Sequence, residues 1–537
     1  MKSSNSKSPH FFHIPVMGTG FTIDTPLRVA KYGISSTISL VDDVLIEQMR
    51  RFHCSKHALQ YQEIRDRDKD SRSNRITAYL DLLNDLISDQ VKALQSSPFE
   101  QGSEITRYFE LLPESPLKRS YLEMLTTSES GEKVKMQDAL RRRAVPGSID
   151  VNIMTKVDRD LYRNGEKLPP EFACAMAALR GYAKSQLRSS IIFSAGMNRR
   201  LYSYITQFDD FFPDDKGIFK KKIILKVSDF RSATIQGKLL ARKGLWISEY
   251  RIESGLDCGG HAFATGGYLM GAILEEFKRK KADMIGHLHE VYSRALTAMG
   301  RPPIQSPHEV RITVQGGIGT ANENKFLLEY YGVDGTGWAT PFLLVPEVTN
   351  VDNDHLKKLS ATTDSNVFLS DCSPLGIPFW TLRNSASEEA RRQRIDAGKP
   401  GSSCPKGYLV CDSEFTQVPI CLASRAYQKR KLEQLSASDI PAEKLSAMKE
   451  NTIAKSCLCH DLAGCATLKL DIDPNARPAV CCGPNIVNFS KVASLEEMIG
   501  HIYGRLSLLV STDRPHMFIR ELMLYVDYLR RELQKTS

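Results

Sequence analysis

The chain has 537 residues, of which 42% are hydrophobic and 25% charged, and its net charge is +9 at pH 7. This composition is typical of a globular protein with a large core and excludes a collagen-like or broadly disordered chain. The small positive excess permits an anionic ligand but does not indicate nucleic-acid binding. Because no run of about 18 apolar residues occurs, we expect no membrane span.

The N-terminus shows no targeting signal: it is rich in Ser and Lys and has no apolar signal-peptide core. The twelve cysteines are too sparse for a secreted disulfide scaffold. We therefore expect a cytoplasmic protein.

The first third of the chain predicts two short strands and then mostly helix. The strand candidates are residues 13–17 and 34–40. In residues 76–94 apolar side chains recur every three or four positions, which predicts an amphipathic helix. A polar loop is expected at residues 126–132.

From residue 149 onward, strand and helix patterns alternate. The predicted strands are 149–154, 190–194, 222–227, 245–252, 310–315 and 333–340, and the predicted helices are 170–186, 197–206, 232–243, 267–299 (one helix or two) and 322–331. Alternation of this kind predicts parallel βα units. Eight strands in all favour a closed (β/α)₈ TIM barrel of the α/β class, spanning residues 1–350 with a helical insertion at about 42–146.

Residues 351–537 are expected to form a C-terminal extension. It contains a flexible Gly- and Ser-rich break at 398–403, a polar helical stretch at 426–449 and an amphipathic helix at 498–534. Its cysteines gather between the two helical stretches.

The sharpest motif is the turn Gly316-Gly317-Ile318-Gly319, which follows the seventh predicted strand and precedes a helix. Glycines let the backbone approach a ligand, and a helix N-terminus offers free N–H groups to an anion. In TIM barrels the loops after strands seven and eight often bind phosphate. Ala339 and Thr340, at the end of the eighth strand, would lie beside this turn. The alternative is a tight turn that simply needs glycine.

A second motif, Cys258-Gly259-Gly260-His261, follows the sixth strand. Its imidazole would lie at the face where barrel active sites occur, and it could remove a proton from an acidic carbon. The alternative is a histidine that caps the following helix. Lys226, at the end of the fifth strand, either faces a flavin or phosphate or is a solvated strand end.

Together these segments resemble the nitronate monooxygenase (2-nitropropane dioxygenase-like) family of FMN-dependent barrel enzymes. The pieces that carry the resemblance are 14–18, 258–261, 316–319, 334–347 and 373–384. The resemblance implies an FMN phosphate on Gly317, Gly319, Ala339 and Thr340, and a flavin ring against Met17 and Gly18. It implies further cofactor contacts from Gly260 and Gly316, and His261 as the base.

The cysteine cluster lies outside the predicted barrel. Clustered thiolates are typical of zinc or iron–sulfur sites, and the candidate ligands are Cys457, Cys459, Cys465, Cys481 and Cys482. Their spacing is not that of a standard zinc finger or ferredoxin, and Cys404, Cys411 and Cys421 are nearby in sequence. The alternative is a set of buried free thiols that pack as small hydrophobic side chains.

The leading hypothesis is an FMN-dependent oxidoreductase that acts on a small substrate with an acidic carbon, such as a nitronate or an enoyl thioester. The electron donor is open, with NAD(P)H as one candidate, and the oligomeric state is unknown. One alternative is a flavin-dependent enzyme that modifies nucleic acid, although the scattered basic runs do not favour it. The other is a metal-stabilised scaffold without catalysis.

Overall fold

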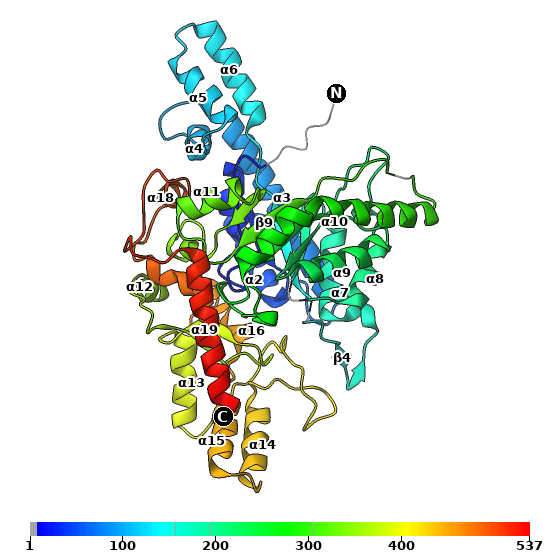
Figure 1. Ribbon diagram of the computed structural model, residues 1–537, viewed down its shortest axis with the longest axis vertical. Coiled ribbons are helices and arrows are strands. Elements are labelled where there is room, and N and C mark those ends of the chain that lie inside the picture. The colour runs from blue at the N-terminus through cyan, green and yellow to red at the C-terminus, as the bar shows by residue number, and fades with distance from the viewer. Residues whose placement is uncertain (1–7, 156, 195, 303, 537) are drawn as a thin grey trace.

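Eight parallel strands close into a barrel at the centre of the molecule (Figure 1). The structure is a computed structural model that describes residues 8–155, 157–194, 196–302 and 304–536. The strands follow the order β1-β10-β9-β8-β7-β6-β3-β2 around the barrel. Their bounds are β1 Phe12–Ile14, β2 Ser35–Ser39, β3 Ile149–Met154, β6 Ser190–Ser194, β7 Lys222–Val227, β8 Ile247–Glu253, β9 Arg311–Gln315 and β10 Gly335–Gly337. The expected (β/α)₈ barrel is confirmed.

Two barrel strands are shorter than expected. β1 ends at Ile14 rather than residue 17, since Pro15 has no N–H to continue the ladder. β10 covers only three residues, from Gly335 to Gly337, where the pattern predicts 333–340. The other six strands agree with their predicted bounds to within two residues at each end.

Helices surround the barrel and follow its strands. Those of the barrel region are α1 Thr25–Val29, α2 Asp43–Lys56, α3 Ser71–Ser96, α4 Glu104–Leu111, α5 Pro116–Thr126, α6 Ser130–Arg143, α7 Cys174–Lys184, α8 Arg199–Tyr204, α9 Phe230–Ala241, α10 Met270–Ala298 and α11 Ala321–Glu329. The stretch predicted as one helix or two is the single helix α10. A small hairpin, β4 Tyr162–Arg163 with β5 Glu166–Lys167, lies between β3 and α7.

The helical insertion after β2 has two parts. α3 packs against α2 and α7 and buries its predicted apolar stripe, including Ile76, Leu80 and Leu83, so it belongs to the ring around the barrel. α4–α6 instead project beyond the end of the barrel (Figure 1). The expected loop at 126–132 is shorter than predicted, because α6 already begins at Ser130.

The interior of the barrel is polar along β8. Glu249, Arg251 and Glu253 alternate with the buried Tyr250 and Ile252, as period-two strand geometry requires. Glu249 accepts hydrogen bonds from Arg251 at 2.7 Å and from Thr313 Oγ1 at 2.6 Å. The charged side chains of β8 therefore extend along the barrel interior to its carboxyl end, where Glu253 is located.

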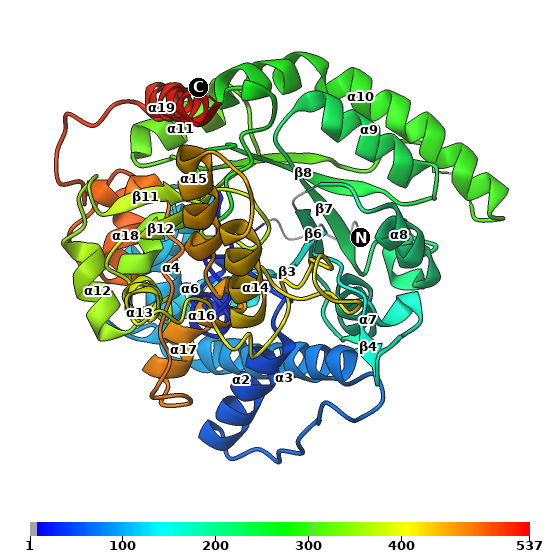
Figure 2. The same cartoon turned by 90° about the horizontal axis from the view of Figure 1, so that it is seen from below.

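The C-terminal extension covers part of the carboxyl end of the barrel. Seen from below, α14–α16 lie in front of the strands (Figure 2), and Gly20 N–H, after β1, donates to Leu462 O at 3.0 Å. Its elements are α12 Asn353–Ser360, β11 Val367–Ser370, β12 Phe379–Leu382, α13 Ala386–Asp396, α14 Arg425–Ser436, α15 Ala442–Ala454, α16 Leu458–Asp461, α17 Gly464–Lys469, α18 Leu495–Ile502 and α19 Met517–Thr536.

Two helix predictions in the extension are wrong in extent. The stretch 426–449 is two helices, α14 and α15, separated before Pro441. The stretch 498–534 is α18 and α19, separated by an irregular segment that contains Gly504 (φ +74°) and Pro515. A left-handed glycine and a proline both end helices, so the sequence carried these break signals.

Among the described residues, no helix has both the length and the apolar character needed to cross a membrane.

Candidate active site at the carboxyl end of the barrel

A cavity lies where β9 and β10 end side by side. Gln315 of β9 pairs with Gly337 of β10, so the turns that follow the two strands are adjacent. Gly316 and Gly317 adopt φ values of +110° and +74°, which only glycine tolerates well. A Cβ on Gly316 would lie 2.8 Å from the Asp257 carbonyl oxygen, so the turn after β9 packs directly against the turn after β8.

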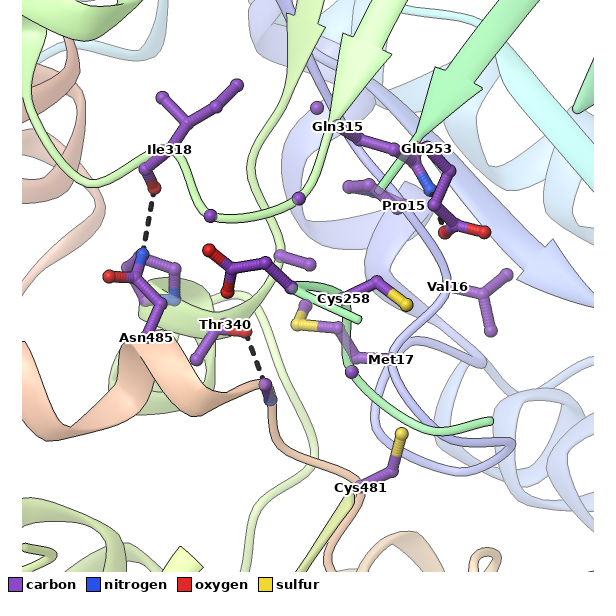
Figure 3. A pocket seen from close by; sticks show the side chains of 18 of the residues that line it. Pro15, Val16, Met17, Glu253, Cys258, Gln315, Ile318, Thr340, Cys481 and Asn485 are labelled. Atoms are coloured by element: carbon purple, nitrogen blue, oxygen red, sulfur yellow. Dashed lines mark hydrogen bonds between the residues drawn. The ribbon is translucent and has the colours of Figure 1, made fainter. Parts of the chain in front are cut away.

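The cavity has a volume of about 60 Å³ and is partly open to solvent. The residues that line it come from the ends of β1, β8, β9 and β10 and from the extension (Figure 3): Pro15, Val16, Met17, Glu253, Asp257, Cys258, Gly259, Gln315, Gly316, Gly317, Ile318, Gly337, Ala339, Thr340, Pro341, Leu343, Cys481, Gly483 and Asn485.

Backbone N–H groups without partners gather at this cavity. Gly317, Ile318, Ala339 and Thr340 all line it, and within the described part of the chain none of their four N–H groups donates a hydrogen bond. Buried backbone donors are almost always paired. Four free donors on two adjacent turns therefore form a cradle for an anion. The donor set fits the phosphate end of FMN.

Gly319, the fourth predicted phosphate residue, does not belong to this cradle. Its N–H donates to Glu323 Oε2 at 2.9 Å, and the N–H of Thr320 donates to the same oxygen at 3.1 Å. Thr320 and Glu323 form a capping box at the start of α11. The Thr-x-x-Glu spacing was visible in the sequence and could have shown that this donor is already used.

The extension holds the glycine turn in place. Arg514 pairs with the buried Glu323 at 2.5 Å and also donates to Gly317 O at 2.5 Å. Asn485 donates to Ile318 O at 2.9 Å, and the N–H of Gly483 donates to Thr340 Oγ1 at 3.2 Å (Figure 3). The turn is thus fixed by residues more than 160 positions later in the chain.

Asp257 is a buried acid at the cavity that the sequence analysis left unassigned. Its side chain lies against Gly317, and its Oδ1 has no hydrogen-bond partner among the described residues. Burial raises its pKa to about 7, with a further increase from Glu521 that Arg514 and Arg520 oppose. A carboxyl group with this pKa exchanges its proton near neutral pH, so it could donate to a bound anion.

Lys226 lies beside the cavity rather than in its lining. It forms an ion pair with Glu253 at 2.9 Å, and Glu253 also accepts from Gln315 Nε2 at 2.7 Å. Glu253 and Gln315 line the cavity and Lys226 does not. Lys226 therefore affects the charge at the cavity through its ion pair with Glu253.

His261 is half-buried next to the cavity and is not among its lining residues. Its Nε2 is 2.7 Å from Ser373 Oγ, and its ring packs edge-on against Phe379. Burial lowers its pKa to about 4, so the imidazole is neutral at neutral pH. A neutral imidazole retains one nitrogen lone pair that can accept a proton.

Sulfur atoms form one wall of the cavity. Met17, Cys258 and Cys481 approach one another there (Figure 3). The Cys481 thiol lies next to the backbone of Gly18, and a Cβ on Gly260 would lie 3.0 Å from its Sγ. The predicted ring-contacting glycines, Gly18 and Gly260, therefore both adjoin Cys481.

The five cysteines predicted as one metal cluster are divided among three places. Cys481 lines the cavity, and Cys482 is buried beside it. Cys465 contacts Asp352, which also binds His355. Cys457 and Cys459 lie elsewhere, with cysteines from an earlier segment. The structure therefore does not bring these five candidate ligands together in one place, although they are close along the chain.

Of the predicted flavin residues, the structure brings five to the cavity lining: Met17, Gly316, Gly317, Ala339 and Thr340. Sequence analysis missed the lining residues Asp257, Glu253 and Asn485. Asp257 directly precedes the glycine-rich turn 258–261, and Glu253 ends a strand whose charged residues alternate, so both carried a signal. Nothing in the sequence around Asn485 indicated its place.

No protein-family model and no curated protein matches the chain. Two similar solved structures are the enoyl reductase domain of MlnA from the macrolactin biosynthesis cluster of Bacillus amyloliquefaciens and a nitroalkane oxidase from Streptomyces ansochromogenes. The first is 15% identical, with 76% of this chain and 89% of that chain covered and a TM-score of 0.34. The second is 9% identical, with 92% and 95% covered and a TM-score of 0.37.

Proposed function

We propose that the chain is an FMN-dependent oxidoreductase that acts on a small substrate with an acidic carbon. The observation that carries the proposal is the cradle of four unpartnered N–H groups, on Gly317, Ile318, Ala339 and Thr340, at the carboxyl end of a closed barrel. Active sites of TIM barrels lie at this end, and their phosphate sites are commonly built from the last two strand–helix turns. The motif resemblance to nitronate monooxygenases supports the same assignment.

In this proposal each part of the cavity has a role. The four N–H groups hold the phosphate, and a protonated Asp257 carboxyl donates to it. Met17 lines the part where the ring system would lie, and Gly18 and Gly260 adjoin Cys481, which lines it too. Glu253 also lines the cavity and is paired there with Lys226. When bound, the flavin supplies the chemistry of electron transfer, which no side chain of the chain supplies by itself.

His261 is the proposed base. Its neutral imidazole takes the proton from the acidic carbon, and Ser373 orients the ring through the 2.7 Å hydrogen bond to Nε2. A positioned general base typically contributes about 10²–10⁴-fold to a rate. His261→Ala should therefore lower turnover of a neutral nitroalkane, whose carbon still carries the acidic proton, about 100-fold or more while FMN still binds. Unchanged turnover with FMN bound would remove His261 from this role.

Binding measurements test the cofactor directly. Apoprotein is titrated with FMN and with riboflavin, which has the same ring system but no phosphate, and the bound flavin is followed by its visible absorbance and fluorescence. We expect FMN to bind at least about tenfold more tightly, because charge-assisted hydrogen bonds contribute roughly 1.5–3 kcal/mol each. Equal affinity for the two compounds would contradict the phosphate cradle, and no affinity for either would contradict the proposed function.

A variant pair locates the flavin. In Gly317→Val the new side chain would collide with the Asp257 carboxyl and close the cradle, so FMN affinity should fall to that of riboflavin or below. Gly286→Ala is the matched control, because Gly286 lies in α10 with nothing within 4 Å of an added Cβ. Circular dichroism and thermal melting check that both variants fold.

A further inference from the structure

Four cysteines from three segments converge outside the cavity. Cys404 lies after α13, Cys421 lies just before α14, and Cys457 and Cys459 lie at the start of α16. Cys421, Cys457 and Cys459 are buried, with 3%, 4% and 7% of their surface exposed, and Cys404 is half-buried. All four thiols are free.

The four thiols form two close pairs that face each other. The Cys404 thiol lies beside the Cys421 thiol, and the Cys457 thiol lies beside the Cys459 thiol. Cys404 also interacts with Cys457 and Cys459 across the two pairs, and Cys421 interacts with Cys459. Within the described part of the chain, no three of these sulfur atoms all lie within 4.8 Å of one another, so the arrangement is two pairs and not yet a tetrahedron.

Backbone groups lie close to three of these sulfur atoms. The backbone of Gly407 is next to the Cys404 thiol, that of Ala423 next to the Cys421 thiol and that of Tyr408 next to the Cys459 thiol, and each favours the thiolate form. N–H groups aimed at sulfur are a feature of metal-thiolate sites, where they stabilise the charge on the ligands. Arg159 lies close enough to Cys404 to stabilise a thiolate there, which adds to the same effect.

The segment that carries Cys404 and Cys421 needs a cross-link. Residues 397–424, all of them described, contain neither a helix nor a strand. Irregular segments longer than about 12–15 residues are uncommon unless they are functional or disordered. This one is docked on the barrel, with Lys406 paired to Asp42 at 2.5 Å and Tyr408 donating to Asp43 at 2.9 Å. Metal sites commonly order segments that lack their own secondary structure.

We propose that Cys404, Cys421, Cys457 and Cys459 form a four-thiolate centre for a thiophilic metal. The centre ties residues 397–424 to α16 over the carboxyl end of the barrel. A zinc ion would draw the two pairs into one tetrahedron, with Zn–S distances of about 2.3 Å. An iron–sulfur cluster is compatible with two separate thiol pairs, because the cysteine ligands of such a cluster bind different iron atoms.

The other compact group of ligand types, Asp352, His355 and Cys465, is a hydrogen-bonded network instead. His355 Nδ1 lies 2.8 Å from Asp352 Oδ2, and Nε2 accepts from the Ala386 N–H at 3.1 Å. Since Nε2 accepts, Nδ1 carries the proton and donates to Asp352, and neither ring nitrogen is free for a metal. Of these two groups, the four-thiol group is the one that keeps its ligand atoms available.

The test measures the metal content of the full-length protein, purified without oxygen from cells supplied with iron and zinc. We expect either about one zinc per chain, or at least two irons with matching acid-labile sulfide and a visible band beyond any flavin. Cys404→Ser, Cys421→Ser, Cys457→Ser and Cys459→Ser should each lose the metal. Cys411→Ser is the matched control, because Cys411 lies in the same segment, is exposed and should leave the metal content unchanged.

Thiol accessibility keeps the test decisive if a variant fails to fold. Wild-type protein is treated with a maleimide before and after a strong chelator, and the labelled cysteines are identified by peptide mass spectrometry. The proposal expects these four thiols to become reactive together once the metal is removed. Metal-free protein in which Cys404 is bonded to Cys421 as a disulfide would overturn it, and so would metal that survives all four substitutions.

Discussion

Two added regions, the helices α4–α6 and the C-terminal extension, have different relations to the site. α4–α6 project beyond the barrel (Figure 1), and no described residue of these helices lines the cavity. The extension covers part of the carboxyl end of the barrel, where Cys481, Gly483 and Asn485 line the cavity and Arg514 holds the glycine turn. A barrel places its chemistry at the carboxyl ends of its strands. Residues added there are part of the site, whereas we expect α4–α6 to contribute to stability and not to cofactor binding.

The strongest test of this difference is Arg514→Ala. The substitution leaves Glu323 as a buried carboxylate without its cation, which typically costs about 3–5 kcal/mol of folding free energy. It also frees the Gly317 carbonyl, so FMN affinity should fall. Urea unfolding and FMN titration measure the two effects. Arg505→Ala is the control at the contact with α4, where the exposed Arg505 reaches the Leu112 carbonyl at 3.3 Å and its loss should cost about 1 kcal/mol or less.

Asp257→Asn should act in the opposite direction and depend on pH. The folded protein holds the Asp257 proton more tightly than the unfolded chain, because the pKa rises from 3.8 to about 7. The carboxylate therefore destabilises the fold as pH rises through this range, by at most about 4 kcal/mol above pH 7. Asn removes this cost, so unfolding free energy should increase at pH 8 and match the wild type near pH 4. An equal change at both pH values would mean that Asp257 is not a buried acid.

A smaller effect is expected at the base of the insertion. The Tyr108 hydroxyl in α4 donates to Val145 O at 3.2 Å and accepts from Val145 N–H at 3.1 Å. Tyr108→Phe leaves these two backbone groups without their partner, which should cost about 1–2 kcal/mol in thermal or urea unfolding. FMN affinity should not change. A loss of FMN affinity in Tyr108→Phe would show that the insertion also influences the cavity.

The smallest effect is expected at the tip of the insertion. Leu122 in α5 is 44% exposed, so Leu122→Glu should change the unfolding free energy by no more than about 0.5 kcal/mol. Neither FMN affinity nor turnover should change. A large loss of stability would instead indicate that this face of α5 is covered in solution, which size-exclusion chromatography with light scattering would detect.

The barrel was predictable because its signals are local. Buried strands such as 222–227 and the apolar stripe of α3 can be recognised from patterns among neighbouring residues. The order of these strands and helices then favours a closed barrel. The glycine turn after β9 was found for the same reason. Glu323 shows a local signal that was present but not used, since its capping box with Thr320 determines where the Gly319 donor points.

The rest depended on contacts between distant residues. Asn485 and Arg514 reach a turn more than 160 residues earlier, and no periodicity or spacing records such a contact. The cysteines show the same limit: Cys457 and Cys459 were identified, but their neighbours Cys404 and Cys421 belong to a segment without regular structure. Sequence proximity instead grouped them with Cys465, Cys481 and Cys482, which the fold separates.

The position of Arg514 has a consequence for synthesis on the ribosome. Domains begin to fold from the N-terminus while translation proceeds at about 5–20 residues per second. The glycine turn at 316–319 is made long before Arg514, so for on the order of 10 s or more the nascent barrel carries Glu323 without the cation that neutralises it. A chain in this interval has a closed sheet but an unfinished cavity. Cofactor loading is therefore expected after release rather than during translation, and a ribosome-stalled chain that stops before Arg514 should not retain FMN.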